Sequence, residues 1–110
     1  MNVPLPFGTP RKEYLACFTQ TVETVADKVR PQLVLLSAGF DAHKEDPVGA
    51  LGLEVEDFGV MTQRVLDIAK VHCQGRLVSC LEGGYNLTAL ADSVRLHLET
   101  LLGQPDEPQA

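Results

Sequence analysis

The sequence has little positive charge, which argues against one large class of function. Its 110 residues hold 9 lysines and arginines against 15 aspartates and glutamates, giving a formal net charge of −6. Proteins that bind nucleic-acid phosphates usually carry a basic face. We therefore expect no direct nucleic-acid partner.

Long apolar runs are also missing. No window approaches the roughly 20 consecutive apolar residues that cross a membrane. The first six residues, Met1 to Pro6, hold neither the basic segment nor the apolar core of a signal peptide. We expect a cytoplasmic protein with no membrane partner, a nuclear location being the alternative if the source is eukaryotic.

Cysteines are few, and their spacing indicates no pair. Cys17, Cys73 and Cys80 form no C-x-x-C pair, and an odd number at irregular spacing favours free thiols in a reducing compartment. Because cysteine is among the most buried residue types, we expect buried thiols at Cys17 and Cys80 rather than a redox site.

Helical periodicity occurs in three segments, residues 10–30, 58–72 and 87–101, where apolar residues recur at steps of three and four. Thr9 and Pro10 suit the start of the first helix, because Thr can cap and Pro is tolerated at the first helical position. Gly75 is expected to close the second helix, and Asn86 to cap the third.

Two apolar segments between these helices, 32–37 and 76–81, are typical of strands covered on both faces. Strands that alternate with helices imply a parallel sheet with right-handed crossovers. The predicted fold is α/β, one domain portion over residues 1–103 with a flexible tail at 104–110. Two strands leave open edges, through which we expect association.

The loops after both strands carry the candidate functional residues. In a parallel sheet the loop with Asp41 and the loop with Tyr85 leave the same edge, where ligands of open α/β sheets bind. A carboxylate can bind a metal or activate water, and a tyrosine hydroxyl can stabilise an oxyanion. The alternative for Asp41 is a turn former or a helix cap.

Two other classes of function stay open on residue types alone. Gly83 and Gly84 before a capped helix could present backbone N–H groups to a phosphate, although that loop holds no Lys or Arg and no phosphate-loop motif occurs. The chain could also be a non-catalytic interaction module that completes its sheet with a partner chain.

Three motifs together closely resemble the C-terminal part of the histone deacetylase family, which includes acetoin-utilisation-type deacetylases and acetylpolyamine amidohydrolases. In order and spacing they are Asn2-Val3-Pro4-Leu5-Pro6, Ser37-Ala38-Gly39-Phe40-Asp41-Ala42-His43 with Asp46-Pro47, and Leu81-Glu82-Gly83-Gly84-Tyr85-Asn86. The resemblance implies part of a three-layer, arginase-like α/β fold. It also implies hydrolysis of N-acetyl groups, on acetyl-lysine or acetylated polyamines and small amines, with Zn²⁺ as cofactor.

By position, Asp41 resembles the second of the two aspartates that hold the family's zinc with a histidine. Tyr85 resembles the tyrosine that hydrogen-bonds the substrate carbonyl and then the oxyanion. Gly83 and Gly84 resemble the turn that lets this tyrosine face the metal and substrate. Zinc lowers the pKa of its bound water and polarises the carbonyl, while a protein donor stabilises the developing negative charge.

Other motifs of the family are missing: the paired histidines that supply its general base, and the Asp-x-His motif that supplies its other two zinc ligands. Since a catalytic zinc needs about three protein ligands, we expect a C-terminal portion that is inactive without the N-terminal half. His43 is expected to pack in its loop or lie at the surface. Glu82 is either a partner of the site or a solvated acid.

Overall fold

Residues 1–103 are described by a computed structural model, and the predicted tail at 104–110 lies outside them. The chain alternates helix and strand, in the order α1 (Arg11–Val29), β1 (Val34–Ala38), α2 (Val55–Cys73), β2 (Leu77–Leu81) and α3 (Leu87–Leu102). β1 and β2 pair in parallel, from Val34 opposite Leu77 to Ala38 opposite Leu81. The predicted α/β fold is confirmed.

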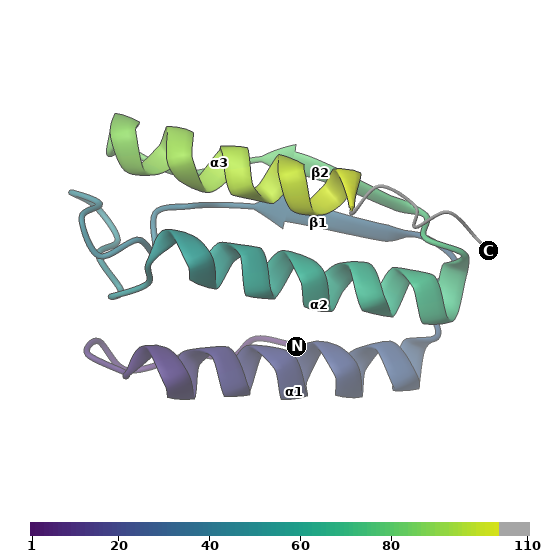
Figure 1. The fold of residues 1–110 in the computed structure, drawn as a ribbon. Coiled ribbons are helices and arrows are strands. Elements are labelled where there is room, and N and C mark those ends of the chain that lie inside the picture. The colour runs from purple at the N-terminus through teal and green to yellow at the C-terminus, as the bar shows by residue number, and fades with distance from the viewer. Residues whose placement is uncertain (104–110) are drawn as a thin grey trace.

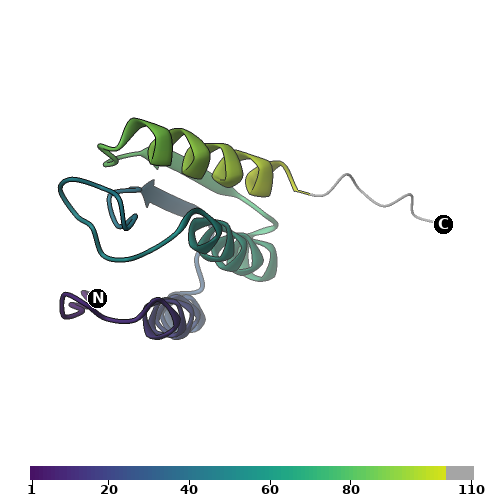
Figure 2. The same ribbon diagram turned by 60° about the vertical axis from the view of Figure 1, so that its left-hand side comes forward.

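The three helices lie side by side, with α2 in contact with both α1 and α3 (Figures 1 and 2). Their apolar stripes meet a core that forms around the carboxyl end of β1. Its buried members are Ala38, Phe40, Leu53 and Phe58, and the rings of Phe40 and Phe58 lie edge to face with centroids 5.1 Å apart. The core therefore sits directly beneath the loop that carries Asp41.

The helices cover one face of the sheet, and the expectation of strands buried on both faces is wrong for this chain. Leu35 is 73% and Val78 48% exposed, although the two residues are partners in the sheet register. Ser37 and Cys80 are the next partners on the same exposed face. The prediction of a buried thiol at Cys80 fails for this reason, whereas Cys17 is partly buried.

The start of α1 differs from the prediction by one residue. Pro10, with φ −59° and ψ 145°, precedes the helix, and no side chain caps it. The Thr9 hydroxyl instead donates to the carbonyl of Pro6 at 2.7 Å, because the chain turns there before the helix begins. Asn86 does cap α3, accepting the N–H of Ala89 at 3.0 Å.

α2 begins three residues earlier than its apolar period indicates, since Glu54 and Asp57 form a reciprocal capping box at its N-terminus. It ends as predicted near Gly75, whose N–H donates to the carbonyl of Ala69 at 2.9 Å. None of the helices within residues 1–103 combines the length and apolarity needed to cross a bilayer.

Candidate functional site

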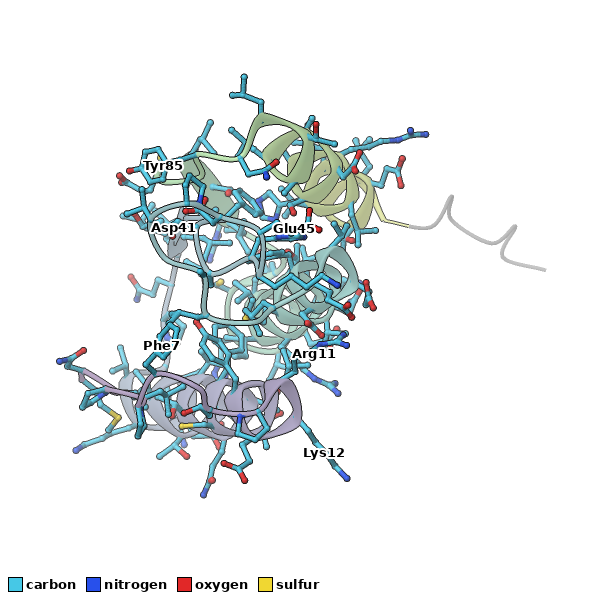
Figure 3. All side chains as sticks on the ribbon, turned by 90° about the vertical axis from the view of Figure 1, so that its left-hand side faces the viewer. Phe7, Arg11, Lys12, Asp41, Glu45 and Tyr85 are labelled. Atoms are coloured by element: carbon cyan, nitrogen blue, oxygen red, sulfur yellow. The ribbon has the colours of Figure 1, made fainter. Side chains whose placement is uncertain are left out.

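The loops after β1 and β2 meet at the carboxyl edge of the sheet. The N–H of Glu82 donates to the carbonyl of Ala38, and the N–H of Phe40 donates to the carbonyl of Gly83, each at 2.8 Å. Asp41 and Tyr85 therefore lie at the same edge, as the parallel topology predicts, and Figure 3 views them from that side.

The carboxylate of Asp41 fills the space beside Gly83. A Cβ atom at Gly83 would lie 2.9 Å from Oδ2 of Asp41, and a Cβ at Gly39 would lie 3.4 Å from its Oδ1. Asp41 itself is half-buried. The absence of a side chain at Gly83 thus sets where this carboxylate rests.

Gly84 is required for two independent reasons. Its φ of +142° is a conformation that residues with a Cβ rarely adopt. A Cβ there would also lie 2.6 Å from Cδ1 of Leu90 and 3.4 Å from Cβ of Phe40. The two glycines therefore bring the backbone close to the core just before Tyr85, whose side chain is 55% exposed.

Asp46 ties the two loops together, a role that sequence reasoning missed. Asp-Pro pairs are typical of turns, and Oδ1 of Asp46 accepts the N–H groups of Val48 at 2.8 Å and Gly49 at 3.0 Å. Its other oxygen, Oδ2, accepts the N–H of Tyr85 at 2.8 Å. The Asp-Pro turn motif predicts the bonds to Val48 and Gly49, but nothing in the sequence indicates the bond to Tyr85.

Burial alone would raise the pKa of Asp46. The backbone N–H groups of Tyr85, Gly49 and Val48 outweigh this and lower its pKa below the ordinary value. Asp46 is 4% exposed. At neutral pH the residue is thus a buried carboxylate whose charge is held by backbone donors.

Gly49, which no feature of the sequence marks, lies against the backbone of Asp41. A Cβ at Gly49 would collide with the carbonyl oxygen of Asp41, and the same oxygen accepts the N–H of Ala50 at 3.1 Å. The loop therefore folds back over Asp41 and fixes its backbone from the far side.

His43 packs inside its loop and lies away from solvent. It is 5% exposed and forms an isolated parallel bridge with Leu53, and its Nδ1 accepts the N–H of Glu45 at 3.0 Å. Glu82 is exposed and accepts the hydroxyl of Ser37 at 2.7 Å on the open face of the sheet.

A cavity of about 280 Å³ lies beneath Asp41, between α1, the end of β1 and α2. Tyr14 of α1 lines it together with Phe40 and Asp41. Burial raises the pKa of Tyr14, and the negative charge of Asp41 raises it further. Tyr14 is therefore a second tyrosine hydroxyl near the site, and no motif marked it in the sequence.

His97 lines the same cavity as Asp41, and both His97 and His72 are engaged in contacts with other residues. His97 bridges Thr62 and Ser79, with Nδ1 2.7 Å from one hydroxyl and Nε2 2.8 Å from the other. Burial lowers the pKa of His97. His72 contacts Asp27 at 3.5 Å.

Within residues 1–103, no three His, Cys, Asp or Glu side chains are placed to hold one metal ion. Asp41 offers one carboxylate, and a catalytic zinc requires about three protein ligands. The described residues therefore do not make a zinc site by themselves. A phosphate site in the Gly83-Gly84 loop is also disfavoured, because Asp46 already accepts the N–H of Tyr85.

The sequence model of the family described as "Histone deacetylase domain" matches residues 1–101. The chain belongs to the histone deacetylase family. This finding agrees with the resemblance carried by the three motifs. Two of these motifs contain Asp41 and Tyr85.

Three relatives show how much of a family member the chain spans. It is 36% identical to "Histone deacetylase 10, chloroplastic" of Oryza sativa subsp. japonica, over 96% of this chain and 24% of that protein. It is 41% identical to "Polyamine deacetylase HDAC10" of Mus musculus, over 97% and 16%. It is 39% identical to a "Probable deacetylase" of Archaeoglobus fulgidus, over 79% and 24%.

A solved structure of the family has the same arrangement of elements. The chain superposes on the HDA15 HD domain with a TM-score of 0.76 and 34% sequence identity, covering 89% of this chain and 27% of that one. The chain thus corresponds to about a quarter of that structure and of the rice and archaeal relatives.

Proposed function

We propose that this chain provides Asp41 and Tyr85 to the active site of a zinc-dependent deacetylase that hydrolyses N-acetyl amide bonds. The observation that supports it is that the loops carrying these two residues meet at one sheet edge, in a chain of the histone deacetylase family. In this proposal the Tyr85 hydroxyl donates to the substrate carbonyl oxygen and stabilises the negative charge that forms there.

Asp41 is proposed to be one ligand of the zinc ion. The remaining ligands and the general base are then proposed to come from residues outside this chain, because no three His, Cys, Asp or Glu side chains of the described residues are placed to hold one metal ion. We propose that the chain is the C-terminal portion of the catalytic domain and is inactive alone. Its match to about a quarter of the rice and archaeal relatives supports this.

The test is reconstitution. The chain would be co-expressed with the N-terminal portion of the domain, taken from its own upstream reading frame or, where none is encoded, from the archaeal relative. Zinc-loaded protein would be assayed on acetyl-lysine peptides, acetylpolyamines and small acetyl compounds. We expect deacetylation that a chelator abolishes. A soluble, zinc-loaded complex with no chelator-sensitive activity on any of the three would overturn the proposal.

The substrate is proposed as an acetylated amine in one of these classes. Relatives named histone deacetylase and polyamine deacetylase support these substrate classes but do not choose among them. We also propose a cytoplasmic location, or a nuclear one in a eukaryote, and no nucleic-acid partner, given the net charge of −6. Imaging a fluorescent fusion of the native gene product would test the location.

A second candidate is a non-catalytic interaction module that completes its sheet with a partner chain. The open face favours it, with Leu35 73% and Val78 48% exposed. Sizing and zinc titration separate the two proposals. A module binds its partner chain without gaining zinc or activity, whereas the deacetylase portion gains both on reconstitution.

A further inference from the structure

Asp46 is a buried acid at the sheet edge where the loops after β1 and β2 meet. It forms hydrogen bonds to both loops. With 4% exposure, its carboxylate lies between the loop after β1 and the loop after β2. Oδ1 accepts two N–H groups from its own loop, Val48 and Gly49, while Oδ2 accepts the N–H of Tyr85 from the other loop at 2.8 Å.

The bond from Asp46 restrains the Tyr85 backbone at its own N–H. Tyr85 is 55% exposed, so packing holds it only in part. Two glycines precede it, and glycine allows more backbone conformations than any other residue. A hydrogen bond to the Tyr85 N–H limits rotation of the peptide that joins Gly84 to Tyr85.

The turn that holds Asp46 is itself well defined. Pro47 restricts the backbone of the residue before it to extended conformations and has no N–H, so the first donors within the turn are Val48 and Gly49. With Oδ1 held by these two groups, Oδ2 is aimed at the other loop. Asn86 adds a separate tie, donating from Nδ2 to the carbonyl of Glu45 at 3.1 Å.

We propose that Asp46 is a positioning residue for Tyr85: its carboxylate fixes the Tyr85 backbone so that the hydroxyl meets the substrate carbonyl. This inference rests on the proposed deacetylase function for the role of the hydroxyl. It does not rest on that function for the bond, which can be measured separately. An ionised acceptor forms a hydrogen bond about twice as strong as a neutral one.

The test compares Asp46→Ala and Asp46→Asn with Glu45→Gln in the reconstituted protein. Alanine removes all three bonds. Asparagine keeps one acceptor oxygen, so it can satisfy one loop and not both. Glu45 is exposed, and its side chain takes no part in the tie, so Glu45→Gln removes one negative charge next door and serves as the matched control.

The chain contains two tyrosines, which makes the first measurement simple. With ¹⁵N-tyrosine incorporated in this chain alone, the Tyr14 and Tyr85 amides give two signals. The Tyr14 amide lies in the first turn of α1, where it donates to the carbonyl of Pro10 at 3.0 Å, and reports on the fold. We expect Asp46→Ala to speed hydrogen exchange at Tyr85 by roughly 10- to 100-fold, since bonds to charged groups are the stronger class, with Tyr14 unchanged.

The second measurement is kinetic. We expect kcat to fall by about 10²-fold in Asp46→Ala, as small misplacements of a reacting group do, with KM and bound zinc close to wild type. Asp46→Asn should lie between Asp46→Ala and wild type in both measurements, and Glu45→Gln should match wild type. If Asp46→Ala fails to fold, Asp46→Asn decides the question.

Normal Tyr85 exchange and normal kcat in a folded Asp46 variant would overturn the inference, as would zinc loss equal to the loss of activity. Failure of the proposed function looks different. In that case the wild-type complex itself shows no deacetylation, while faster Tyr85 exchange in Asp46→Ala still shows that Asp46 holds the Tyr85 backbone.

Discussion

On the helix-covered face of the sheet, Leu36 and Ala38 pack against the core, whereas on the opposite face Leu35 and Val78 are 73% and 48% exposed. The carboxyl edge of the sheet is likewise complete in one respect and incomplete in another. Hydrogen bonds tie the backbone around Asp41 and Tyr85, yet within residues 1–103 no three His, Cys, Asp or Glu side chains are placed to hold one metal ion. If Asp41 is a zinc ligand as proposed, we expect the N-terminal portion of the domain both to cover the open face and to supply the other ligands.

The largest effect is expected from Asp41→Asn in the reconstituted protein. An amide is a poorer, uncharged zinc ligand than a carboxylate, so the variant should lose bound zinc and nearly all activity. Metal analysis beside kinetics measures both. Full zinc content in Asp41→Asn would show that the edge built by this chain does not hold the metal.

Tyr85→Phe should leave zinc in place and slow turnover. Removing one donor to a developing oxyanion typically costs about 10²–10³ in kcat, and the phenyl ring keeps the shape of the side chain. Kinetics and metal analysis on the same preparation test this. Zinc loss as large as that of Asp41→Asn would contradict the separate roles given to the two residues.

The elements could be predicted because their signals are local. Apolar residues at helical spacing and the cap at Asn86 mark helices that the structure confirms. Parallel topology then placed Asp41 and Tyr85 at one edge. The roles of these two residues remain predictions that the variants above test.

The features that sequence reasoning missed depend on contacts between distant segments. An apolar run does not reveal which face of a strand lacks a cover, so Cys80 was expected to be buried and is exposed. The bond from Tyr85 to Asp46 spans 39 positions, and no periodicity encodes it. Thr9 was expected to cap α1, but Pro10 occupies the cap position and the Thr9 hydroxyl donates to the carbonyl of Pro6.

Low pH should reduce the free energy of unfolding through His97, which lies on the helix-covered side of the sheet. His97 is 5% exposed and lies between Thr62 and Ser79. Its pKa is lowered by burial, so below the ordinary value of about 6.5 the unfolded chain binds the proton more readily than the folded one. The free energy of unfolding should therefore fall as pH drops below that value and be fully retained above it.

Urea unfolding of the chain at pH 7.5 and pH 5.5 checks this expectation. His97→Gln, which cannot take up a proton in this range, serves as the control and should show a smaller difference between the two pH values. Equal pH dependence in wild type and His97→Gln would assign the effect to other groups.

The two faces of β1 allow the sharpest comparison, because neighbouring leucines point to opposite sides. In the chain alone, Leu36→Ala should lower the free energy of unfolding by roughly 2 kcal/mol, the scale for removing a largely buried leucine. Leu35→Ala should change it by less than about 0.5 kcal/mol, as exposed sites do. Urea unfolding of both variants measures the difference.

On reconstitution, Leu35→Ala should gain an effect that it lacks in the isolated chain. If the N-terminal portion of a deacetylase domain covers the open face, Leu35→Ala weakens assembly of the complex while leaving the isolated chain as stable as before. Equal losses from Leu35→Ala and Leu36→Ala in the isolated chain would mean that copies of the chain already cover this face, and sizing at the same concentration would show the association. Unchanged assembly in Leu35→Ala would place the contact with the rest of the domain elsewhere, at the sheet edges.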